Sequence, residues 1–306
     1  MKNKLIAYFQ LFMAMFLAGS SVVVGKLIVN VFPVFLSQGI TLLIALVGIF
    51  PLAWIFEGNV FKERISKRDL FFMWLQALTG MFLFRIFLLY GLKFTTATES
   101  GIITSTNPAI LAILSLILLK EKIRFKTWLG IIICIAGIVL VNFVKTSSSS
   151  TTLSLRLLGN ALILLAVIGE SLFTVFRKKI SFSDKPITST LIIIAFSLLM
   201  FLPISVYESI SFDYTKLVLY DFIPLIIYGL FCTVIAYICW FSGVSKVKIS
   251  VAAGFTGIMP ISSVVLSFLI LHETITWQHI AGVILVLIGI YTIAFFKTNE
   301  KGTLVE

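Results

Sequence analysis

One stretch of this chain occurs twice, and that repeat limits the folds that the sequence can adopt. Residues 91–143 align with residues 243–295 without a gap when the numbering is shifted by 152. The alignment matches residues that are not simply apolar: Thr104 with Thr256, Pro108 with Pro260, Glu121 with Glu273, Gly130 with Gly282, and Gly137 with Gly289. Apolar composition alone gives scattered matches and not one continuous register. The sequence therefore predicts two copies of one structural unit.

The composition places both copies in a lipid bilayer. The 306 residues are 59% hydrophobic with a mean hydropathy of +1.12, and 12% are charged, whereas about 25% is typical of soluble domains. Apolar runs of about 20 residues recur along the chain, and each is long enough to cross a bilayer as a helix. The first run, from Leu5 to about Val24, is longer than the apolar region of a signal peptide, which indicates a retained helix. We expect an all-α integral membrane protein.

Ten transmembrane helices fit the apolar runs. They are expected near residues 5–26, 33–55, 70–92, 95–119, 125–144, 157–178, 187–207, 219–243, 249–271 and 277–296. A Ser/Thr-rich stretch near the midpoint has the composition of a linker. The expected domains are a first five-helix repeat at 1–145, a linker at 146–156, a second five-helix repeat at 157–296 and a cytoplasmic tail at 297–306.

Basic residues predict which loops face the cytoplasm. With the N-terminus inside, 18 of the 24 Lys and Arg residues lie in cytoplasmic loops or at the termini, and five lie in outer loops. This asymmetry places the N-terminus and the C-terminus in the cytoplasm. Because five is an odd number, the two five-helix repeats must then be inverted. The repeat agrees, since residues 120–126 hold four basic residues and the matching residues 272–278, expected outside, hold no Lys or Arg.

Two prolines at corresponding positions indicate where a substrate path runs. Helices 4 and 9 each contain Thr-x-x-x-Pro, as Thr104 to Pro108 and Thr256 to Pro260. Proline removes a backbone donor and displaces the carbonyl group four residues earlier, so both helices are expected to kink. Kinks at equivalent places in two repeats point to the path, and the alternative is a tolerated kink in a packed bundle. The glycine pairs of the repeat, seven residues apart, predict close-packed faces on helices 5 and 10.

Three charged residues fall inside the expected spans, where a charge costs roughly 2.5–3.5 kcal/mol at the bilayer centre. Arg85 lies in helix 3, Glu99 in the first turns of helix 4, and Glu170 in helix 6. At about 1.5 Å of rise per residue, Arg85 and Glu99 reach similar depths, so we expect them to pair. Glu170 is then without a partner, which favours its neutral form and makes it the candidate proton-linked or amine-sensing group. The alternatives are a structural network of all three, or a pair of Glu170 with Arg85.

Uncharged side chains complete the candidate set. Asn107 lies in helix 4, while Tyr237 and Trp240 lie about one turn apart in helix 8. Such residues are more often interhelical hydrogen-bonding or interfacial residues than ligand contacts. The candidate substrate-binding residues are Arg85, Glu99, Thr104, Asn107, Glu170, Tyr237, Trp240 and Thr256, with Pro108 and Pro260 as helix kinks.

Several functional classes are excluded by the sequence. The net charge of +11 comes from loop residues and not from one basic face, which argues against nucleic-acid binding. No Walker A or G-x-S-x-G motif occurs, and the two histidines, His272 and His279, lack the spacing of a zinc protease motif. The three cysteines lie within apolar runs, which indicates packing. We expect no enzyme activity, no catalytic residue, no cofactor and no metal.

The repeated pattern resembles that of the drug/metabolite transporter superfamily, specifically its EamA-type ten-helix bacterial transporters. The pattern here is Pro108, Glu121 and Gly130, then Pro260, Glu273 and Gly282, and the resemblance covers about residues 5–296. The sequence also departs from the family. Gly19 and Gly169 match the first-helix pattern, but Ala18 and Ile168 stand where tryptophan is common, and Gln38 stands where many members carry an arginine. Arg85 would replace that charge.

The resemblance implies a secondary transporter of the bacterial cytoplasmic (inner) membrane, often an exporter, with a central cavity lined by helices 1, 3, 4, 6, 8 and 9. One half is expected to rock against the other in alternating access. A cavity with Arg85 and carboxylates suits an amino acid or a similar zwitterion. The alternatives are a multidrug exporter of lipophilic cations, favoured by Glu170 and 29 phenylalanines, and a non-transporting membrane subunit. A proton is the candidate coupling ion, and the sequence is compatible with a monomer or a homodimer.

Overall fold

The computed structural model describes residues 2–58, 65–119, 125–142, 153–177, 179–180, 185–244, 246–247 and 255–298. Glu121, residues 146–152 of the predicted linker, residues 249–254 at the expected start of helix 9 and residues 299–306 of the predicted tail lie outside these ranges. Within the described ranges every regular element is a helix. The α-helices are α1 (Lys2–Val31), α2 (Val34–Glu57), α3 (Lys67–Gln76), α4 (Phe84–Phe94), α5 (Ala97–Thr104), α6 (Asn107–Leu119), α7 (Phe125–Asn142), α8 (Leu153–Arg177), α9 (Pro186–Ser211), α10 (Ile223–Ile226), α11 (Ala236–Val244), α13 (Ile258–Leu271) and α14 (Trp277–Thr298).

Two π-helical segments and two 3₁₀ turns complete the elements. They are η2 (Ala77–Leu83), η3 (Tyr214–Lys216), η4 (Leu219–Phe222) and η5 (Ile227–Ile235). α3, η2 and α4 run on as span 3, α5 and α6 form span 4, and α10, η5 and α11 form span 8. The described chain thus forms the ten expected helical spans. α8 begins at Leu153, four residues before the expected start, so the last residues of the predicted linker are helical.

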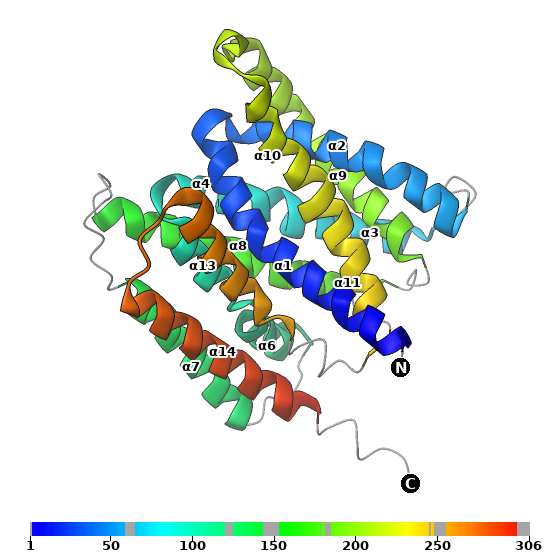
Figure 1. The fold of residues 1–306 in the computed structure, drawn as a ribbon. Helices are drawn as coiled ribbons and strands as arrows, with labels where there is room; N and C mark the ends of the chain where they lie inside the picture. Colours follow the sequence, from blue (N-terminus) through cyan, green and yellow to red (C-terminus); the bar gives the residue numbers. More distant parts are fainter. Residues whose placement is uncertain are drawn as a thin grey trace.

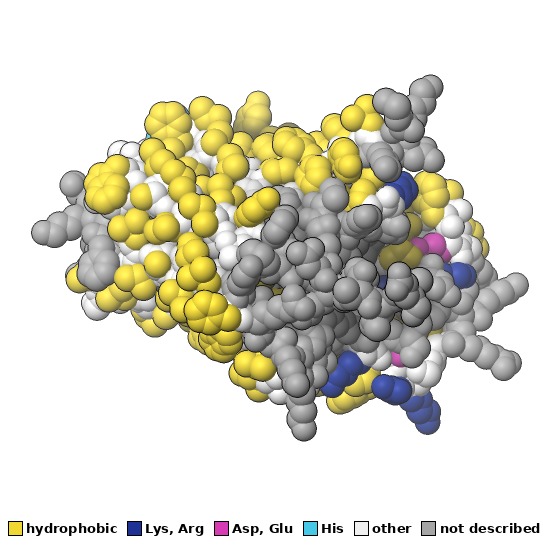
Figure 2. All heavy atoms as spheres, turned by 90° about the horizontal axis from the view of Figure 1, so that it is seen from below, with side chains coloured by type: hydrophobic (Ala, Val, Ile, Leu, Met, Phe, Trp, Pro, Cys, Tyr) yellow, Lys and Arg dark blue, Asp and Glu magenta, His cyan; other side chains and the backbone are white. Residues whose placement is uncertain are grey.

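Apolar sequence on all faces makes these helices suited to lipid. Seven of the described spans are long and apolar enough to cross a membrane, and three shorter apolar helices lie at Trp128–Leu140, Ile258–Leu271 and Trp277–Ile293. Large apolar side chains such as Val47, Ile55 and Ile210 are exposed on the outer surface. Figure 2 shows apolar side chains covering one side of the molecule, with the Lys and Arg side chains gathered toward one end. This distribution is that of a multi-pass membrane protein.

Equivalent helices of the two repeats pack against each other in opposite directions. α7 lies against α14, and α2 lies against α9, at opposite edges of the molecule (Figure 1); we call these the edge pairs. A Cβ on Gly130 would lie 2.9 Å from the carbonyl oxygen of Gly289, and one on Gly137 would lie 3.0 Å from that of Gly282. α7 and α14 are therefore antiparallel. The glycine faces predicted for helices 5 and 10 are confirmed.

The second edge pair is joined at both of its ends by acidic side chains. The Glu57 carboxylate, at the end of α2, accepts from the N–H groups of Ile187 at 2.8 Å and Thr188 at 2.7 Å at the start of α9. Glu208, near the end of α9, accepts from the N–H group of Leu36 at the start of α2 at 2.7 Å. Each carboxylate satisfies helix donors that have no partner within their own helix. The reciprocal contacts give the two repeats an inverted, pseudo-two-fold relation.

The two repeats interleave, so the bundle does not divide into one half for each repeat. α8 of the second repeat packs on α3, η2, α4, α5 and α6 of the first, and we call this set the α8 group. α1 of the first repeat packs on α10, η5, α11 and α13 of the second, and this set is the α1 group. The two groups lie between the edge pairs (Figure 1). The start of α1 and the end of α14 lie at the same end of the bundle.

Candidate substrate path

Span 4 is interrupted between α5 and α6. Thr104 ends α5, and Ser105 and Thr106 form a turn. The Ser105 hydroxyl donates to the carbonyl oxygen of Gly101, and the Thr106 hydroxyl donates to that of Ile103, each at 2.6 Å. Such side chains compete with the backbone for hydrogen bonds, which holds a turn in place within the bundle. Thr104 is fully buried and donates to Gly101 of its own helix at 3.1 Å.

Span 9 is interrupted at the equivalent place. Thr256 and Gly257 form a turn before α13 begins at Ile258, and Thr256 itself is half-buried. The prolines lie in the first turns of the new helices, Pro108 in α6 and Pro260 in α13. Proline is tolerated there because the first turn of a helix has no internal partner for its N–H groups. The two predicted kinks are therefore breaks, a feature of helices that line transport sites.

Spans 3 and 8 carry a second repeated irregularity. η2 and η5 are π-helical, and residues 77–83 of η2 correspond to residues 229–235 of η5 in the repeat register. π-helical turns are rare and occur frequently at functional sites. Each repeat therefore has one π-helical span and one broken span. The apolar sequences of these segments gave no sign of the π-helical turns.

Arg85 lies in the first turn of α4, just after η2, and is buried among neutral partners. Its Nη1 donates to Gln38 Oε1 at 2.8 Å, and its Nη2 donates to Thr233 Oγ1 at 2.8 Å. The Thr41 hydroxyl lies 3.5 Å from Nη1, and the guanidinium carbon lies 5.0 Å from the centroid of the Tyr228 ring. Among the described residues no carboxylate forms an ion pair with Arg85. A buried guanidinium with neutral partners alone keeps a capacity for an anion.

The predicted pair of Arg85 with Glu99 is wrong. Glu99 Oε2 accepts from the Thr95 hydroxyl at 2.9 Å and from Asn160 Nδ2 at 3.0 Å, and Glu99 Oε1 lies 3.9 Å from Arg156 Nε. The partners Asn160 and Arg156 belong to the first turns of α8. Arg156 falls within the predicted linker at 146–156, so the sequence did not mark it as a partner of Glu99. Glu99 is fully buried in this network, near the end of the bundle where α5 begins.

Glu170 lies in α8 beside the break in span 4. Its Oε2 is enclosed and has no hydrogen-bond partner among the described residues. The neighbouring Ser171 hydroxyl donates to Asn107 Oδ1 at 2.5 Å, which ties α8 to the first residue of α6. A carboxylate oxygen without a partner in a bilayer span is costly, and such groups commonly serve protons or substrates. The structure thus brings Asn107 to Ser171, the neighbour of Glu170 in α8, at the broken helix.

Tyr237 lies near both charged groups, Glu170 and Arg85. Its ring meets that of Phe173 edge to face at 6.2 Å. In the repeat register Tyr237 is the counterpart of Arg85, and Trp240 follows it by about one turn, half-buried. Equivalent positions of the two repeats therefore carry different side chains, Arg85 in the first and Tyr237 in the second.

The alignment of the first helices requires a correction. Gly19 and Gly169, which both match the first-helix pattern, would be equivalent with a shift of 150. In the structure Gly19 packs on the backbone of Met259, and Ser171 contacts Asn107, the residue that corresponds to Met259. The shift of 152 therefore holds through these helices as well, and Glu170 corresponds to Ala18. The carboxyl of the path is present in one repeat alone.

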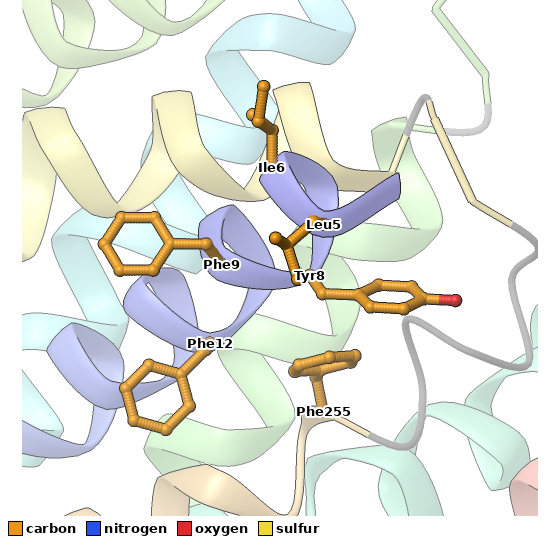
Figure 3. A pocket seen from close by; sticks show the side chains of 6 residues that line it. All are labelled: Leu5, Ile6, Tyr8, Phe9, Phe12 and Phe255. Carbon is orange, nitrogen blue, oxygen red and sulfur yellow. The ribbon is translucent and has the colours of Figure 1, made fainter. Parts of the chain in front are cut away.

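An apolar hollow lies away from this set of residues. It is lined by Leu5, Ile6, Tyr8, Phe9, Phe12 and Phe255 (Figure 3). The first five belong to the start of α1, and Phe255 precedes the break in span 9. Leu5 and Phe9 are 72% and 64% exposed, as expected for side chains that face lipid chains. Apart from the hydroxyl group of Tyr8, the side chains that line the hollow are hydrocarbon and cannot orient a polar metabolite.

Some residues of the path were not found by sequence reasoning. Thr41, Thr233 and Tyr228 surround Arg85, yet each lies within an apolar run that gave no reason to select it. The repeat register offered one signal, because Tyr228 corresponds to Gln76, a fully buried amide that donates to the carbonyl oxygen of Phe173 at 2.9 Å. Polar residues at matched positions of two repeats mark such sites better than isolated ones.

The fold and the path define a multi-pass membrane protein of the transporter class. Inverted repeats, broken helices and charged groups at the breaks are the features of that class. The chain belongs to the EamA-like transporter family, whose model matches residues 5–143 and again residues 157–295. It is a member of a transporter family and not an enzyme.

The relatives agree with this membership. An "Uncharacterized transporter YetK" of Bacillus subtilis (strain 168) is 42% identical over 296 residues, which cover 97% of this chain and 89% of that protein. An "Uncharacterized transporter" of Archaeoglobus fulgidus is 27% identical over 237 residues, which cover 76% of this chain and 81% of that protein. A solved crystal structure covers 97% of this chain and 99% of its own with a TM-score of 0.65 at 18% identity, so the fold is shared.

Proposed function

We propose that this protein is a secondary active transporter that exports a small zwitterionic metabolite, such as an amino acid, across the bacterial cytoplasmic membrane. The observation that carries the proposal is that the two ionisable groups of the path have no oppositely charged partner among the described residues. Arg85 is a buried cation with neutral partners, and Glu170 Oε2 is a buried acceptor without a partner. A zwitterion would compensate both groups at once, its carboxylate at Arg85 and its amine at Glu170.

Asn107, Tyr237 and Trp240 complete the proposed site. Asn107 and Tyr237 supply polar groups next to Glu170, and Trp240 supplies an aromatic wall. Thr104 and Thr256 flank the breaks. Glu99 holds the network at the start of α5 and acts on the path from outside the site. A proton taken up at Glu170 is the proposed coupling ion.

The interleaved packing favours a motion different from half against half. The α8 group and the α1 group each contain helices of both repeats, and the path runs between them. Rocking one group against the other would expose Arg85 and Glu170 first to one side of the membrane and then to the other. The edge pairs, joined by glycine packing and by reciprocal caps, would act as the fixed supports of this motion.

Export of a lipophilic cation is the second candidate. It is favoured by Glu170 and by the aromatic contact between Tyr237 and Phe173, because a cation needs one carboxylate and aromatic faces. In that case Arg85 would keep its three neutral partners throughout transport and serve the packing of α2, α4 and η5.

Thermal stabilisation of the purified protein separates the two candidates. A ligand that binds the folded state raises the unfolding temperature, by the equivalent of about 2.7 kcal/mol at one hundred times its Kd. We expect amino acids to stabilise the wild type, and Arg85→Ala and Glu170→Gln to abolish the effect. Flux in liposomes with the same ligand must then depend on the same two residues.

The opposite results would assign the other candidate. Stabilisation by cationic dyes alone, abolished by Glu170→Gln and retained by Arg85→Ala, would replace the zwitterion with a lipophilic cation. Absence of any substrate-dependent flux from the protein alone would overturn the transporter proposal in favour of a membrane subunit.

A further inference from the structure

Two charged side chains on the α1 side of the bundle, Lys26 and Glu273, contact one corner of the α8 group. The corner is formed by residues 92–98, where α4 ends and α5 begins. Glu273, in the loop after α13, accepts from the N–H groups of Ala97 and Thr98, each at 2.8 Å, and from the Thr98 hydroxyl at 2.7 Å. Lys26 Nζ, from α1, donates to the carbonyl oxygen of Thr95 at 2.8 Å and to that of Leu92.

The signs of the two charges match the helix ends that they contact. The start of a helix presents free N–H groups and a partial positive charge, which an anion such as Glu273 neutralises. The end of a helix presents free carbonyl groups and a partial negative charge, which a cation such as Lys26 neutralises. Lys26 and Glu273 also attract each other. Together they satisfy free carbonyl groups where α4 ends and free N–H groups where α5 begins.

These contacts cross between the two groups of helices. The corner belongs to the α8 group, whereas Lys26 lies in α1 and Glu273 follows α13, both of the α1 group. α5 also packs on α13 through Ser263, which lies against Gly101 and donates to the Ala97 carbonyl at 3.4 Å. α5 then ends at the break beside Asn107. One short helix therefore connects the corner to the path.

Other acidic caps at the ends of the bundle join different partners. Glu208 caps α2 at the same end as the corner, but it lies within an edge pair. The sequence register adds a separate observation: Lys26 corresponds to Lys178 and Glu273 to Glu121, so each charge has a counterpart in the other repeat. Lys178 and Glu121 lie outside the described residues.

We propose that Lys26 and Glu273 form a latch that closes this end of the path, and that it must release the α4–α5 corner before this end can open. The latch rests on the proposed transport by alternating access. Release frees α5 to move with the α8 group away from α13, which opens the joint between Gly101 and Ser263. Lys26 and Glu273 are positioning residues, since neither belongs to the proposed substrate site.

Labelling of a buried cysteine tests the latch without a substrate. The reporter is Ser263→Cys in a chain with Cys134, Cys232 and Cys239 replaced, because Ser263 is fully buried in the joint. A membrane-impermeant maleimide is added to vesicles of each orientation. We expect slow labelling with the latch intact, and roughly 5- to 30-fold faster labelling with Glu273→Gln or Lys26→Met, the factor that one or two kcal/mol corresponds to.

The matched control is Glu208→Gln, which removes a cap of the same kind at the same end. We expect it to leave the labelling rate unchanged. The latch is overturned if neither Glu273→Gln nor Lys26→Met raises the rate, or if Glu208→Gln raises it equally. Gel filtration and thermal unfolding of each variant show that it is folded. Faster labelling without any flux would uphold the latch and count against the proposed transport alone, so the two failures are distinguishable.

Discussion

At the scale of single residues, the path sets two opposite charges in unlike surroundings. The guanidinium group of Arg85 donates hydrogen bonds to neutral oxygens of three side chains, so its position is fixed before any ligand binds. Glu170 has an enclosed oxygen with no donor, so its charge is the least supported in the path. A group of this kind changes its protonation more readily than a paired one. The cation is therefore a fixed anchor, and the carboxyl is the group that responds to protons.

Substitution of Glu170 tests the proton coupling. We expect transport by the wild type to change with pH between about pH 5 and 8, because a desolvated carboxyl without a charged partner can exchange protons near neutrality. Glu170→Gln keeps the shape of the side chain and removes the titration, so its residual transport is expected to be independent of pH. The measurement is substrate flux in liposomes at a series of pH values. Normal transport by Glu170→Gln over the whole range would exclude this residue as the proton site.

Residue-level reasoning from sequence succeeded for isolated charges and failed for their partners. Arg85 and Glu170 stood out because charges are rare within apolar spans. The partner of Glu99 did not, because Arg156 lies just before the expected start of this helix at residue 157, whereas α8 begins at Leu153. Thr41 and Thr233 carry no signal in an apolar run, and three-dimensional packing alone brings them to Arg85.

At the scale of elements, the repeat predicted more than composition did. The ten spans and the glycine faces follow from apolar length and from spacing on one helix face. The breaks in spans 4 and 9 did not follow from Pro108 and Pro260 alone. The hydroxyls of Ser105 and Thr106 turn a kink into a break, and their hydrogen bonds depend on local geometry. The π-helical turns have no signature that periodicity can detect.

The edge pair of α7 and α14 gives a prediction about packing. Gly137→Leu places a side chain where a Cβ already lies 2.9 Å from Val286 and 3.0 Å from the carbonyl oxygen of Gly282. Overpacking of this kind costs about 1–3 kcal/mol, so we expect a lower unfolding temperature in detergent. The matched control is Ile135→Leu on the exposed face of the same helix, which should unfold like the wild type. Equal unfolding temperatures for both variants would mean that the two helices are not closely packed there.

At the scale of the whole molecule, the orientation in the membrane is a prediction from loop charges. The start of α1 and the end of α14 share one end of the bundle, and we propose that this end is cytoplasmic (Figure 1). A fluorescent protein fused after residue 306 should therefore fold and fluoresce, whereas alkaline phosphatase at the same place should be inactive. The inverse pattern, with active phosphatase and no fluorescence, would reverse the proposed topology and turn the latch toward the cytoplasm.

The interleaving of the repeats has a consequence for how the chain is made. When the ribosome has completed the first repeat, Arg85 lacks Thr233, Glu99 lacks Asn160, and the start of α5 lacks Glu273. Every one of these partners is synthesised later. The unfinished molecule therefore has polar groups without their final partners during translation, and we expect the insertion machinery to shelter them until the second repeat is made.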